Sequence, residues 1–135
     1  MTYYFDMDGV LADFHRDYHD REQAYSFDYL ANLPVFSENV ETLNALIMRG
    51  ENCYILTKAA SEDAMRGKLV WLAKYVPMMK KEKFICIVGY GKKVNFMREE
   101  GVLIDDDITN CKQWEKEGHA AIHLNSKGEK IILSY

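Results

Sequence analysis

Short apolar runs alternate with longer amphipathic stretches along this chain of 135 residues. The apolar runs predict β-strands near residues 2–6, 52–57, 84–88, 102–105 and 119–123. Between them, apolar residues at helical spacing predict helices near residues 38–49, 61–75, 92–100 and 110–117. Strands that alternate with helices are typical of an α/β protein, so we expect a doubly wound, mostly parallel, Rossmann-like sheet flanked by helices.

Residues at the ends of the expected elements support these bounds. Gly50 follows the first long helix and suits its end, because glycine is common just beyond a helix. Ser61 suits the N-cap of the next helix. The residues expected to form the buried stripe of that helix are Met65, Leu69, Leu72 and Val76. The tail 130–135 predicts a short edge strand, and the length fits a single domain over residues 1–135.

Charge and cysteine content narrow the possible environments and partners. The net charge of −4 argues against a nucleic-acid polymer as partner, because proteins that bind one usually present a basic surface. No apolar run is long enough to span a membrane, and we expect no signal peptide before the first strand. Cys53, Cys86 and Cys111 lie far apart, which predicts free thiols in a reducing cytoplasm.

The first expected strand ends in two carboxylates, Asp6 and Asp8, which Gly9 follows. Because side chains alternate along a strand, both would leave the same face of the sheet. Two like charges this close raise the free energy unless a cation lies between them or one of them takes up a proton. Carboxylate oxygens suit Mg²⁺, although a polar strand end with a capping aspartate would give the same residues.

Polar side chains also follow the later strands. Thr57 ends the second strand, Lys92 and Lys93 follow the third, and Asp105 and Asp106 end the fourth. In a parallel α/β sheet, ligands bind outside the carboxyl ends of the strands. The sequence therefore predicts a metal, a nucleophile, a hydroxyl and a cation in one crevice, which is what phosphoryl transfer needs.

Three motifs, in order along the chain, carry a resemblance to a known family. They are Asp6-Met7-Asp8-Gly9-Val10-Leu11-Ala12-Asp13-Phe14, then Ile55-Leu56-Thr57, and, after a lysine, Leu103-Ile104-Asp105-Asp106. This series resembles the haloacid dehalogenase (HAD) superfamily of phosphatases, and its first and last motifs are most similar to the 5'(3')-deoxyribonucleotidase branch. Two features depart from the family pattern: the lysine lies farther ahead of the last motif, and the cap segment is very short.

The resemblance implies a role for each acid of the motifs. Asp6 would be the nucleophile that forms an aspartyl-phosphate, and Asp8 would act as general acid and then as base. Mg²⁺ would be held by Asp6, by the backbone carbonyl of Asp8, and by Asp105 and Asp106 directly or through water. A carboxylate attacks phosphorus well only while it is ionised and its charge is partly masked, and Mg²⁺ would do both.

The resemblance also implies the substrate contacts. Thr57 would donate a hydrogen bond to the transferring phosphoryl group, and Lys93 would neutralise charge on the nucleophile and on the phosphate. Lys92 is the rival for the lysine role, and Lys58 and Tyr25 are further candidates for substrate binding. The implied substrate is a small phosphate ester, in the first place a deoxyribonucleoside monophosphate.

Residues 15–33, between the first motif and the first long helix, would form a minimal cap. Their aromatic residues are Tyr18, Tyr25, Phe27 and Tyr29. These rings would either form a lid that stacks on a nucleobase or belong to a helix packed on the sheet edge or on a second subunit, as in a homodimer.

Other polar residues near the motifs have simpler interpretations. His15 and His19 lie four residues apart, but we expect an exposed polar helix there and not a zinc site. Asp107 is expected to be a solvated turn residue. Asn110 would either hold the metal loop or cap the last helix.

Two other functions remain open. A receiver-type signalling domain shares the size, the doubly wound fold and an acidic Mg²⁺ site, but its phosphorylated aspartate stands alone on a middle strand after an acidic pair. That order does not match this chain. A HAD phosphatase or phosphotransferase that acts on sugar phosphates, or with broad specificity, would carry the same motifs.

Overall fold

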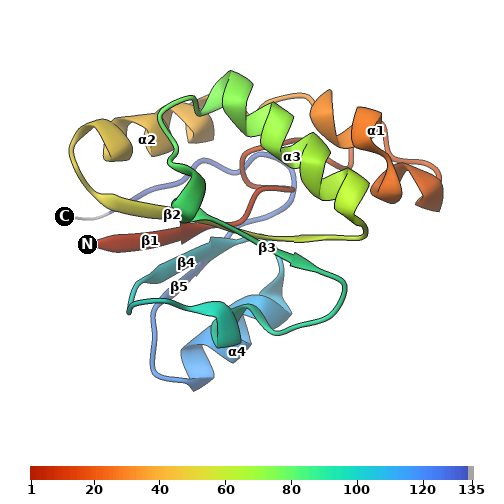
Figure 1. The fold of residues 1–135 in the computed structure, drawn as a ribbon. Coiled ribbons are helices and arrows are strands. Elements are labelled where there is room, and N and C mark those ends of the chain that lie inside the picture. The colour runs from red at the N-terminus through yellow and green to blue at the C-terminus, as the bar shows by residue number, and fades with distance from the viewer. Residues whose placement is uncertain (134–135) are drawn as a thin grey trace.

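The computed structural model describes residues 1–133 and contains a five-stranded sheet with helices on both faces (Figure 1). The strands are β1 (Thr2–Phe5), β2 (Asn52–Ala59), β3 (Phe84–Val88), β4 (Val102–Asp105) and β5 (Ala121–His123). Their order in the sheet is β3-β2-β1-β4-β5, and every pair is parallel. The expected α/β fold is confirmed, and β1 lies at the centre of the sheet.

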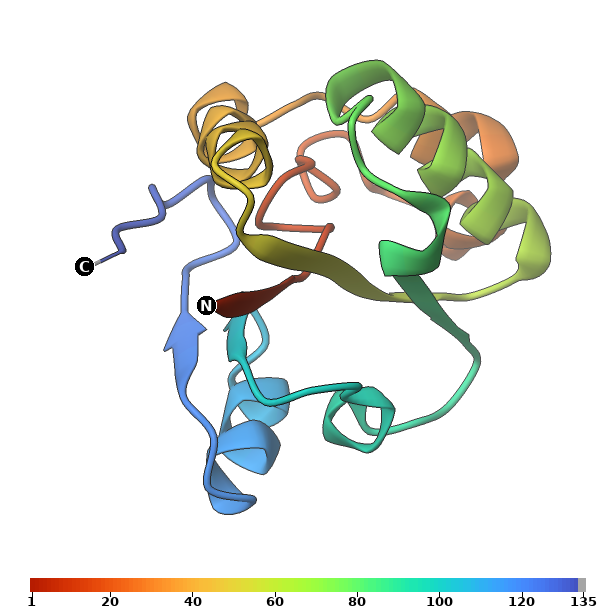
Figure 2. The same cartoon turned by 60° about the vertical axis from the view of Figure 1, so that its left-hand side comes forward.

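Helices cover both faces of this sheet. The α-helices are α1 (Phe27–Ala31), α2 (Ser37–Met48), α3 (Glu62–Tyr75) and α4 (Ile108–Lys116). Short 3-10 helices form at η1 (Arg21–Tyr25), η2 (Lys81–Lys83) and η3 (Lys93–Phe96). Two views agree that α1, α2 and α3 lie on one face and α4 on the other (Figure 1, Figure 2). None of the helices within residues 1–133 has the length and apolar run that a membrane crossing requires.

Alternate residues of the strands contribute to two buried clusters. Tyr3 and Phe5 of β1 belong to the cluster that includes residues of α2 and α3, whereas Tyr4 belongs to a second cluster with Trp114 of α4. The Tyr4 ring stacks on Tyr54 of β2 with 4.8 Å between centroids, and it meets Trp114 edge-on at 5.1 Å. Because the central strand is buried on both faces, its charged residues come only after the strand has ended.

The buried face of α3 differs from the expected stripe. Ser61 caps the helix as predicted, and its hydroxyl accepts a hydrogen bond from the backbone of Ala64 at 3.1 Å. Leu69, however, is 40% exposed. The buried residues of this helix are Ala64, Gly67, Lys68, Trp71 and Leu72. The other three expected residues are confirmed, since Leu72 and Val76 are buried and Met65 is partly buried against the core. Leu69 was wrong, and the buried face also includes a glycine and a lysine, which hydrophobic spacing does not count.

The prediction of a helix over residues 92–100 is also wrong, since only the short turn of η3 forms there. The backbone amides of Arg98 and Glu99 donate to the hydroxyl of Tyr4, at 3.0 and 2.9 Å. That hydroxyl in turn donates to the carbonyl of Glu99 at 2.6 Å. A side chain of the central strand therefore binds the backbone groups that a longer helix would have used.

The edge strand expected in the tail does not form over residues 130–133, and residues 134–135 lie outside the described part of the chain. The backbone amide of Ile131 instead donates to the side chain of Asn39 at 2.8 Å. The side-chain amide of Asn39 donates to the carbonyl of Glu129 at 2.9 Å. A buried asparagine of α2 therefore binds the tail in place of a strand partner.

Two loops near the site also differ from expectation. No helix forms at His15 and His19, which are both exposed in the loop before η1. Asp107 is exposed, but its carboxylate caps α4 by accepting hydrogen bonds from the backbone of Thr109 at 2.8 Å and of Asn110 at 3.3 Å. Asn110 thus lies inside the helix, and its side chain is available for other contacts.

Candidate functional site

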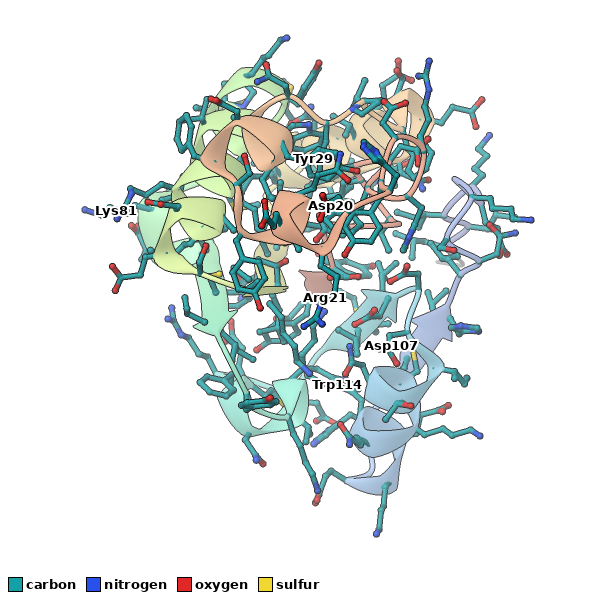
Figure 3. All side chains as sticks on the ribbon, turned by 90° about the vertical axis from the view of Figure 1, so that its right-hand side faces the viewer. Asp20, Arg21, Tyr29, Lys81, Asp107 and Trp114 are labelled. Carbon is teal, nitrogen blue, oxygen red and sulfur yellow. The ribbon has the colours of Figure 1, made fainter. Side chains whose placement is uncertain are left out.

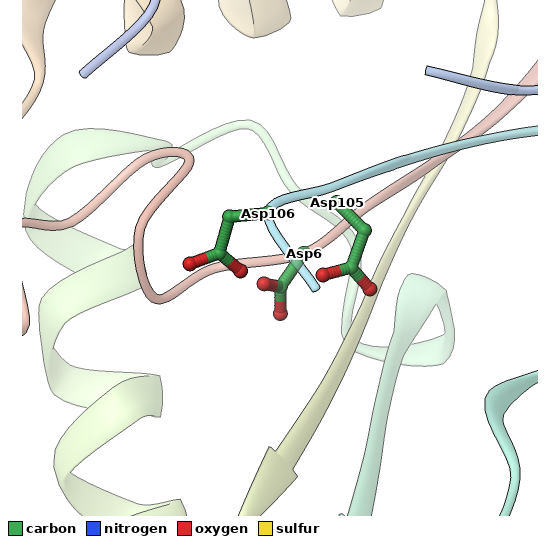
Figure 4. Close-up of side chains that lie close together, drawn as sticks. All are labelled: Asp6, Asp105 and Asp106. Atoms are coloured by element: carbon green, nitrogen blue, oxygen red, sulfur yellow. The ribbon is translucent and has the colours of Figure 1, made fainter. Parts of the chain in front are cut away.

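Three carboxylates meet at the edge of the sheet where the parallel strands end (Figure 4). Asp6 follows β1, Asp105 ends β4, and Asp106 comes next. One oxygen from each of the three lies within 4.8 Å of the others. The backbone amide of Asp6 donates to the carbonyl of Ile104 at 2.8 Å. The pairing of β1 with β4 therefore brings the first and last motifs of the sequence together.

Lys93 lies between two of these acids. Its ammonium is 2.9 Å from Oδ1 of Asp6 and 2.7 Å from Oδ2 of Asp105. The side chain is 2% exposed, whereas the neighbouring Lys92 is exposed. The structure thus brings Lys93 to the acids, as predicted, and leaves Lys92 in solvent.

Asp105 is the most fully bound of the three acids. Besides the ammonium of Lys93, its Oδ2 accepts a hydrogen bond from the side-chain amide of Asn110 at 3.1 Å. Its Oδ1 accepts one from the backbone amide of Asp107 at 2.9 Å. Of the two roles open to Asn110, support of the acidic loop is therefore the one that its side chain fulfils.

Burial and crowding raise the pKa values of the acids. Burial raises the pKa of Asp6 to about 6, with Lys93 opposing the shift and Asp106 adding to it. Burial and the charge of Asp6 raise the pKa of Asp105 to about 6, and burial also raises the pKa of Asp106. Burial alone would lower the pKa of Lys93, but the two carboxylates outweigh it and raise that pKa. One ammonium offsets only part of this negative charge, which favours a second cation.

The turn after β1 leaves room for Asp106. Gly9 has a φ of +84°, a conformation that L side chains rarely adopt. A Cβ at this position would lie 2.0 Å from Oδ2 of Asp106. Asp106 can therefore approach the turn only because residue 9 is a glycine. Together with Asp6 and Asp105 it offers hard oxygen atoms, and this set fits a divalent cation such as Mg²⁺.

Sequence reasoning missed a buried lysine at the site, Lys68 of α3. It is 1% exposed, and its ammonium donates to Oδ2 of Asp8 at 2.8 Å and to Oγ1 of Thr57 at 2.7 Å. The carboxylate of Asp8 is thus paired with Lys68 and stands outside the three-acid group, while the expected metal contact of its backbone carbonyl stays a prediction. The available signal was spacing: Lys68 lies four residues after Ala64 and three before Trp71, both buried.

An open crevice of about 470 Å³ lies over these groups. Besides the acids, its lining includes Lys93, Asn110, Phe14, His15 and the exposed Lys58. Thr57 is 1% exposed and lies behind this surface, where Lys68 binds it. Tyr25 is 51% exposed and is not part of the lining, so the structure does not bring its ring to the crevice.

The insert over residues 15–33 packs against α3. A Cβ on Gly67 of that helix would lie only 2.5 Å from the carbonyl oxygen of Phe27 in α1. The indole of Trp71 donates to the carbonyl of Leu33 at 2.9 Å, and the hydroxyl of Ser61 donates to the carbonyl of Tyr25 at 3.0 Å. The insert is therefore a layer that rests on α3.

Its aromatic rings mostly contact one another. Phe14 lies 4.8 Å from Tyr18 and 5.5 Å from Tyr29 between ring centroids. The hydroxyl of Tyr29 donates to the backbone carbonyl of Phe14. Seen from the side on which the strands end, Asp20 and Tyr29 of the insert lie above Asp107 (Figure 3). These contacts favour the packing interpretation of the insert over the lid.

No protein-family model matches this chain, and no curated protein matches it. A function for the chain is therefore inferred from its residues and their geometry.

Proposed function

We propose that this chain is a Mg²⁺-dependent phosphomonoester hydrolase of the HAD type that works through an aspartyl-phosphate on Asp6. The observation that carries the proposal is the position of Asp6 at the end of the central strand. There its carboxylate lies 2.9 Å from the ammonium of Lys93. One of its oxygens also lies within 4.8 Å of an oxygen of each of two further carboxylates. A carboxylate nucleophile needs a cation beside it before a phosphate dianion can come close. The ammonium of Lys93 is one such cation, and the three carboxylates favour a metal ion as a second.

The chemistry takes two steps. An oxygen of Asp6 attacks phosphorus, the bond from phosphorus to the ester oxygen breaks, and Asp8 donates its carboxyl proton to that oxygen. The alcohol leaves, and a water then attacks the phosphorus of the aspartyl-phosphate while Asp8 takes a proton from it. Inorganic phosphate departs and the carboxylate of Asp6 is restored. Mg²⁺, when bound by Asp6, Asp105 and Asp106, supplies positive charge beside the phosphate.

The proposed substrate is a small phosphate ester, in the first place a deoxyribonucleoside monophosphate of the cytoplasm. The residues of the first and last motifs support a nucleotide substrate, because they are most similar to the 5'(3')-deoxyribonucleotidase branch. The open crevice also suits it, because Phe14 offers an aromatic ring and Lys58 offers a cation at the lining. Sugar phosphates are the alternative class, since nothing at the crevice closes over a nucleobase within residues 1–133.

Phosphate release from a panel of esters, measured in Mg²⁺ and in EDTA, tests this proposal. The panel comprises 5'- and 3'-deoxyribonucleotides, ribonucleotides, sugar phosphates and p-nitrophenyl phosphate. We expect turnover that requires Mg²⁺ and is highest on the deoxyribonucleotides. Turnover of p-nitrophenyl phosphate alone would reject the nucleotide assignment and keep the phosphatase, and no turnover on any ester would reject the enzyme.

The variant Asp6→Asn tests the nucleophile. The amide keeps the shape of the side chain but cannot form the acyl phosphate, so we expect kcat to fall at least about 10³-fold. Beryllofluoride, which mimics an aspartyl-phosphate, should inhibit the wild-type protein. Asp63→Asn, on the exposed side of α3, is the matched control and should keep full activity. Activity of Asp6→Asn near that of the control would exclude Asp6 as the nucleophile.

A further inference from the structure

Lys68 is a charged residue inside the core of the protein, and the catalytic steps described above do not use it. Only 1% of the residue is exposed, and it extends from the buried face of α3. Removing a lysine from water costs free energy unless hydrogen bonds and an opposite charge compensate. The compensation here comes from two residues of the proposed catalytic machinery, Asp8 and Thr57, at 2.8 and 2.7 Å.

The chemistry of an ammonium fixes the direction of both hydrogen bonds. An ammonium only donates, so Oγ1 of Thr57 must accept, and the hydrogen of this hydroxyl is left for another acceptor. In the same way Oδ2 of Asp8 accepts from Lys68. The other oxygen of Asp8, Oδ1, is buried and has no hydrogen-bond partner among residues 1–133. Lys68 thus binds Oδ2 of Asp8 and Oγ1 of Thr57. It does not bind Oδ1 of Asp8 or the hydroxyl hydrogen of Thr57.

The helix that carries Lys68 is itself held in place from outside. Gly67, the preceding residue, is in such close contact with α1 that a Cβ would lie 2.5 Å from the carbonyl of Phe27. Trp71, one turn later, donates to the carbonyl of Leu33 at 2.9 Å. The insert therefore fixes the height of α3 over the sheet, and with it the position of the ammonium.

We propose that Lys68 is a positioning residue, which is anchored by the buried Thr57 and holds the carboxyl group of Asp8 in place at the crevice for proton exchange with the leaving oxygen. This inference rests on the proposed function. It gives the short insert a role other than that of a lid, since the insert positions α3 and α3 positions the acid.

Leaving-group dependence separates this role from a merely structural one. An alkyl phosphate such as a deoxyribonucleoside 5'-monophosphate needs a proton on its leaving oxygen, whereas p-nitrophenolate leaves without one. In Lys68→Met we expect kcat for the alkyl ester to fall on the order of 100-fold more than kcat for p-nitrophenyl phosphate, since general acid catalysis contributes this much. Lys74→Met, an exposed lysine on the same helix, is the matched control and should leave both values unchanged.

A double variant keeps the test decisive if Lys68→Met folds poorly. Asp8→Asn/Lys68→Met leaves no unpaired charge at this position, and adding Lys68→Met to Asp8→Asn should not change the ratio of the two rates further. An equal loss on both esters in Lys68→Met, or a further change of the ratio in the Asp8→Asn background, would overturn the role of Lys68 alone. Absence of Mg²⁺-dependent turnover of either ester by the wild-type protein would overturn the proposed function, and the role of Lys68 with it.

Discussion

Asp6 is a buried and crowded acid, and this crowding can be measured without any substrate. Its carboxylate accepts a hydrogen bond from Lys93 at 2.9 Å, yet burial and the neighbouring Asp106 raise its pKa to about 6. The attraction of one ammonium is thus weaker than the combined effect of lost hydration and a second carboxylate. At neutral pH and without a metal ion, the ionised form of Asp6 lowers the stability of the fold.

This cost depends on pH in a defined direction. The pKa of Asp6 is about 6 in the fold, against an ordinary value of 3.8, so the fold favours the neutral form. The contribution of Asp6 to stability is fully present below about pH 4 and is lost as the pH rises through about 6. In EDTA we therefore expect Asp6→Asn to gain stability relative to the wild-type protein between pH 5 and pH 7. Urea unfolding at the two pH values measures this difference.

The control for this measurement is Asp63→Asn, since Asp63 is exposed on α3. Its stability relative to the wild-type protein should be the same at both pH values. If the stability of Asp6→Asn relative to the wild-type protein were also the same at both pH values, the crowding of Asp6 would not affect the free energy of unfolding. Saturating Mg²⁺ should reduce the pH effect in the wild-type protein, because a bound cation favours the ionised carboxylates.

Two adjacent lysines provide a second comparison between single residues. Lys93 is 2% exposed between Asp6 and Asp105, whereas Lys92 is in solvent. Lys93→Met leaves two buried carboxylates without their cation, and we expect it to lower the free energy of unfolding in EDTA by about 3 kcal/mol. Lys92→Met should change it by less than about 0.5 kcal/mol. Similar unfolding curves for the two variants would contradict the buried ion pair.

Among the elements, α1 and α3 pack so closely at Gly67 that their contact is sensitive to added volume. The Cβ of Gly67→Ala would lie 2.5 Å from a backbone carbonyl, and backbone atoms cannot move aside as a flexible side chain can. Alanine favours a helix by about 1 kcal/mol over glycine, but the overlap works against this gain. We expect a net loss of up to about 2 kcal/mol in unfolding free energy, because overpacking typically costs about 1–3 kcal/mol and the helix-propensity gain offsets about 1 kcal/mol of it.

Val70→Ala is the matched control for that variant. Val70 lies on the same helix and is 49% exposed, so its truncation raises helix propensity and should change stability little. If Gly67→Ala were as stable as this control, the insert would not be packed on α3 as described. If Gly67→Ala also lowered the turnover of alkyl esters, the loss would link the insert to the position of Lys68.

The elements also show how far the sequence could predict this structure. The strands and the long helices follow from local periodicity, and the three acids follow from the rule that parallel strands end at one edge. Lys93 was predicted from the family resemblance, in which the lysine opens a helix, although only the short turn of η3 forms there. The short form of η3 was not, since it depends on the Tyr4 hydroxyl, which binds backbone amides more than ninety residues away in sequence.

Lys68 could not be assigned from the sequence for a similar reason. A lysine on an amphipathic helix is ordinarily a surface residue. Its partners Asp8 and Thr57 lie sixty and eleven residues away, in the turn after β1 and in β2. Only the packing of α3 over the carboxyl ends of β1 and β2 makes the contact possible. Side chains that pair across elements are therefore the part of the site that local patterns leave open.

For the whole molecule, one sheet joins the candidate metal site to both buried clusters. The first cluster lies between the sheet and α2 and α3, the second between the sheet and α4, and β1 contributes to both. If Mg²⁺ binds the native protein and not the unfolded chain, it should stabilise everything that unfolds with the sheet. This stabilisation should be observable at residues far from the metal site.

The cysteines provide that observation. Cys53 and Cys111 are 4% and 1% exposed, and burial raises the pKa of each thiol to about 12, so the native protein presents almost no reactive thiolate at these positions. Cys86 is half-buried and its pKa is raised as well. With a thiol reagent at pH 8, we expect Cys86 to react first, and Cys53 and Cys111 to react only when the structure opens. In denaturant, all three should react at once.

Mg²⁺ then distinguishes global from local opening. Cys111 lies beside the site, with its sulfur 3.9 Å from the carbonyl oxygen of Asp105, whereas Cys53 lies at the opposite end of β2 from Thr57. If the molecule opens as one unit, Mg²⁺ at 100 times its Kd should slow the labelling of both thiols by about 100-fold. Slowing of Cys111 alone, read by peptide mass spectrometry, would mean that the site opens separately from the far end of the sheet. Equal slowing would show that the metal site and the far end of the sheet open together.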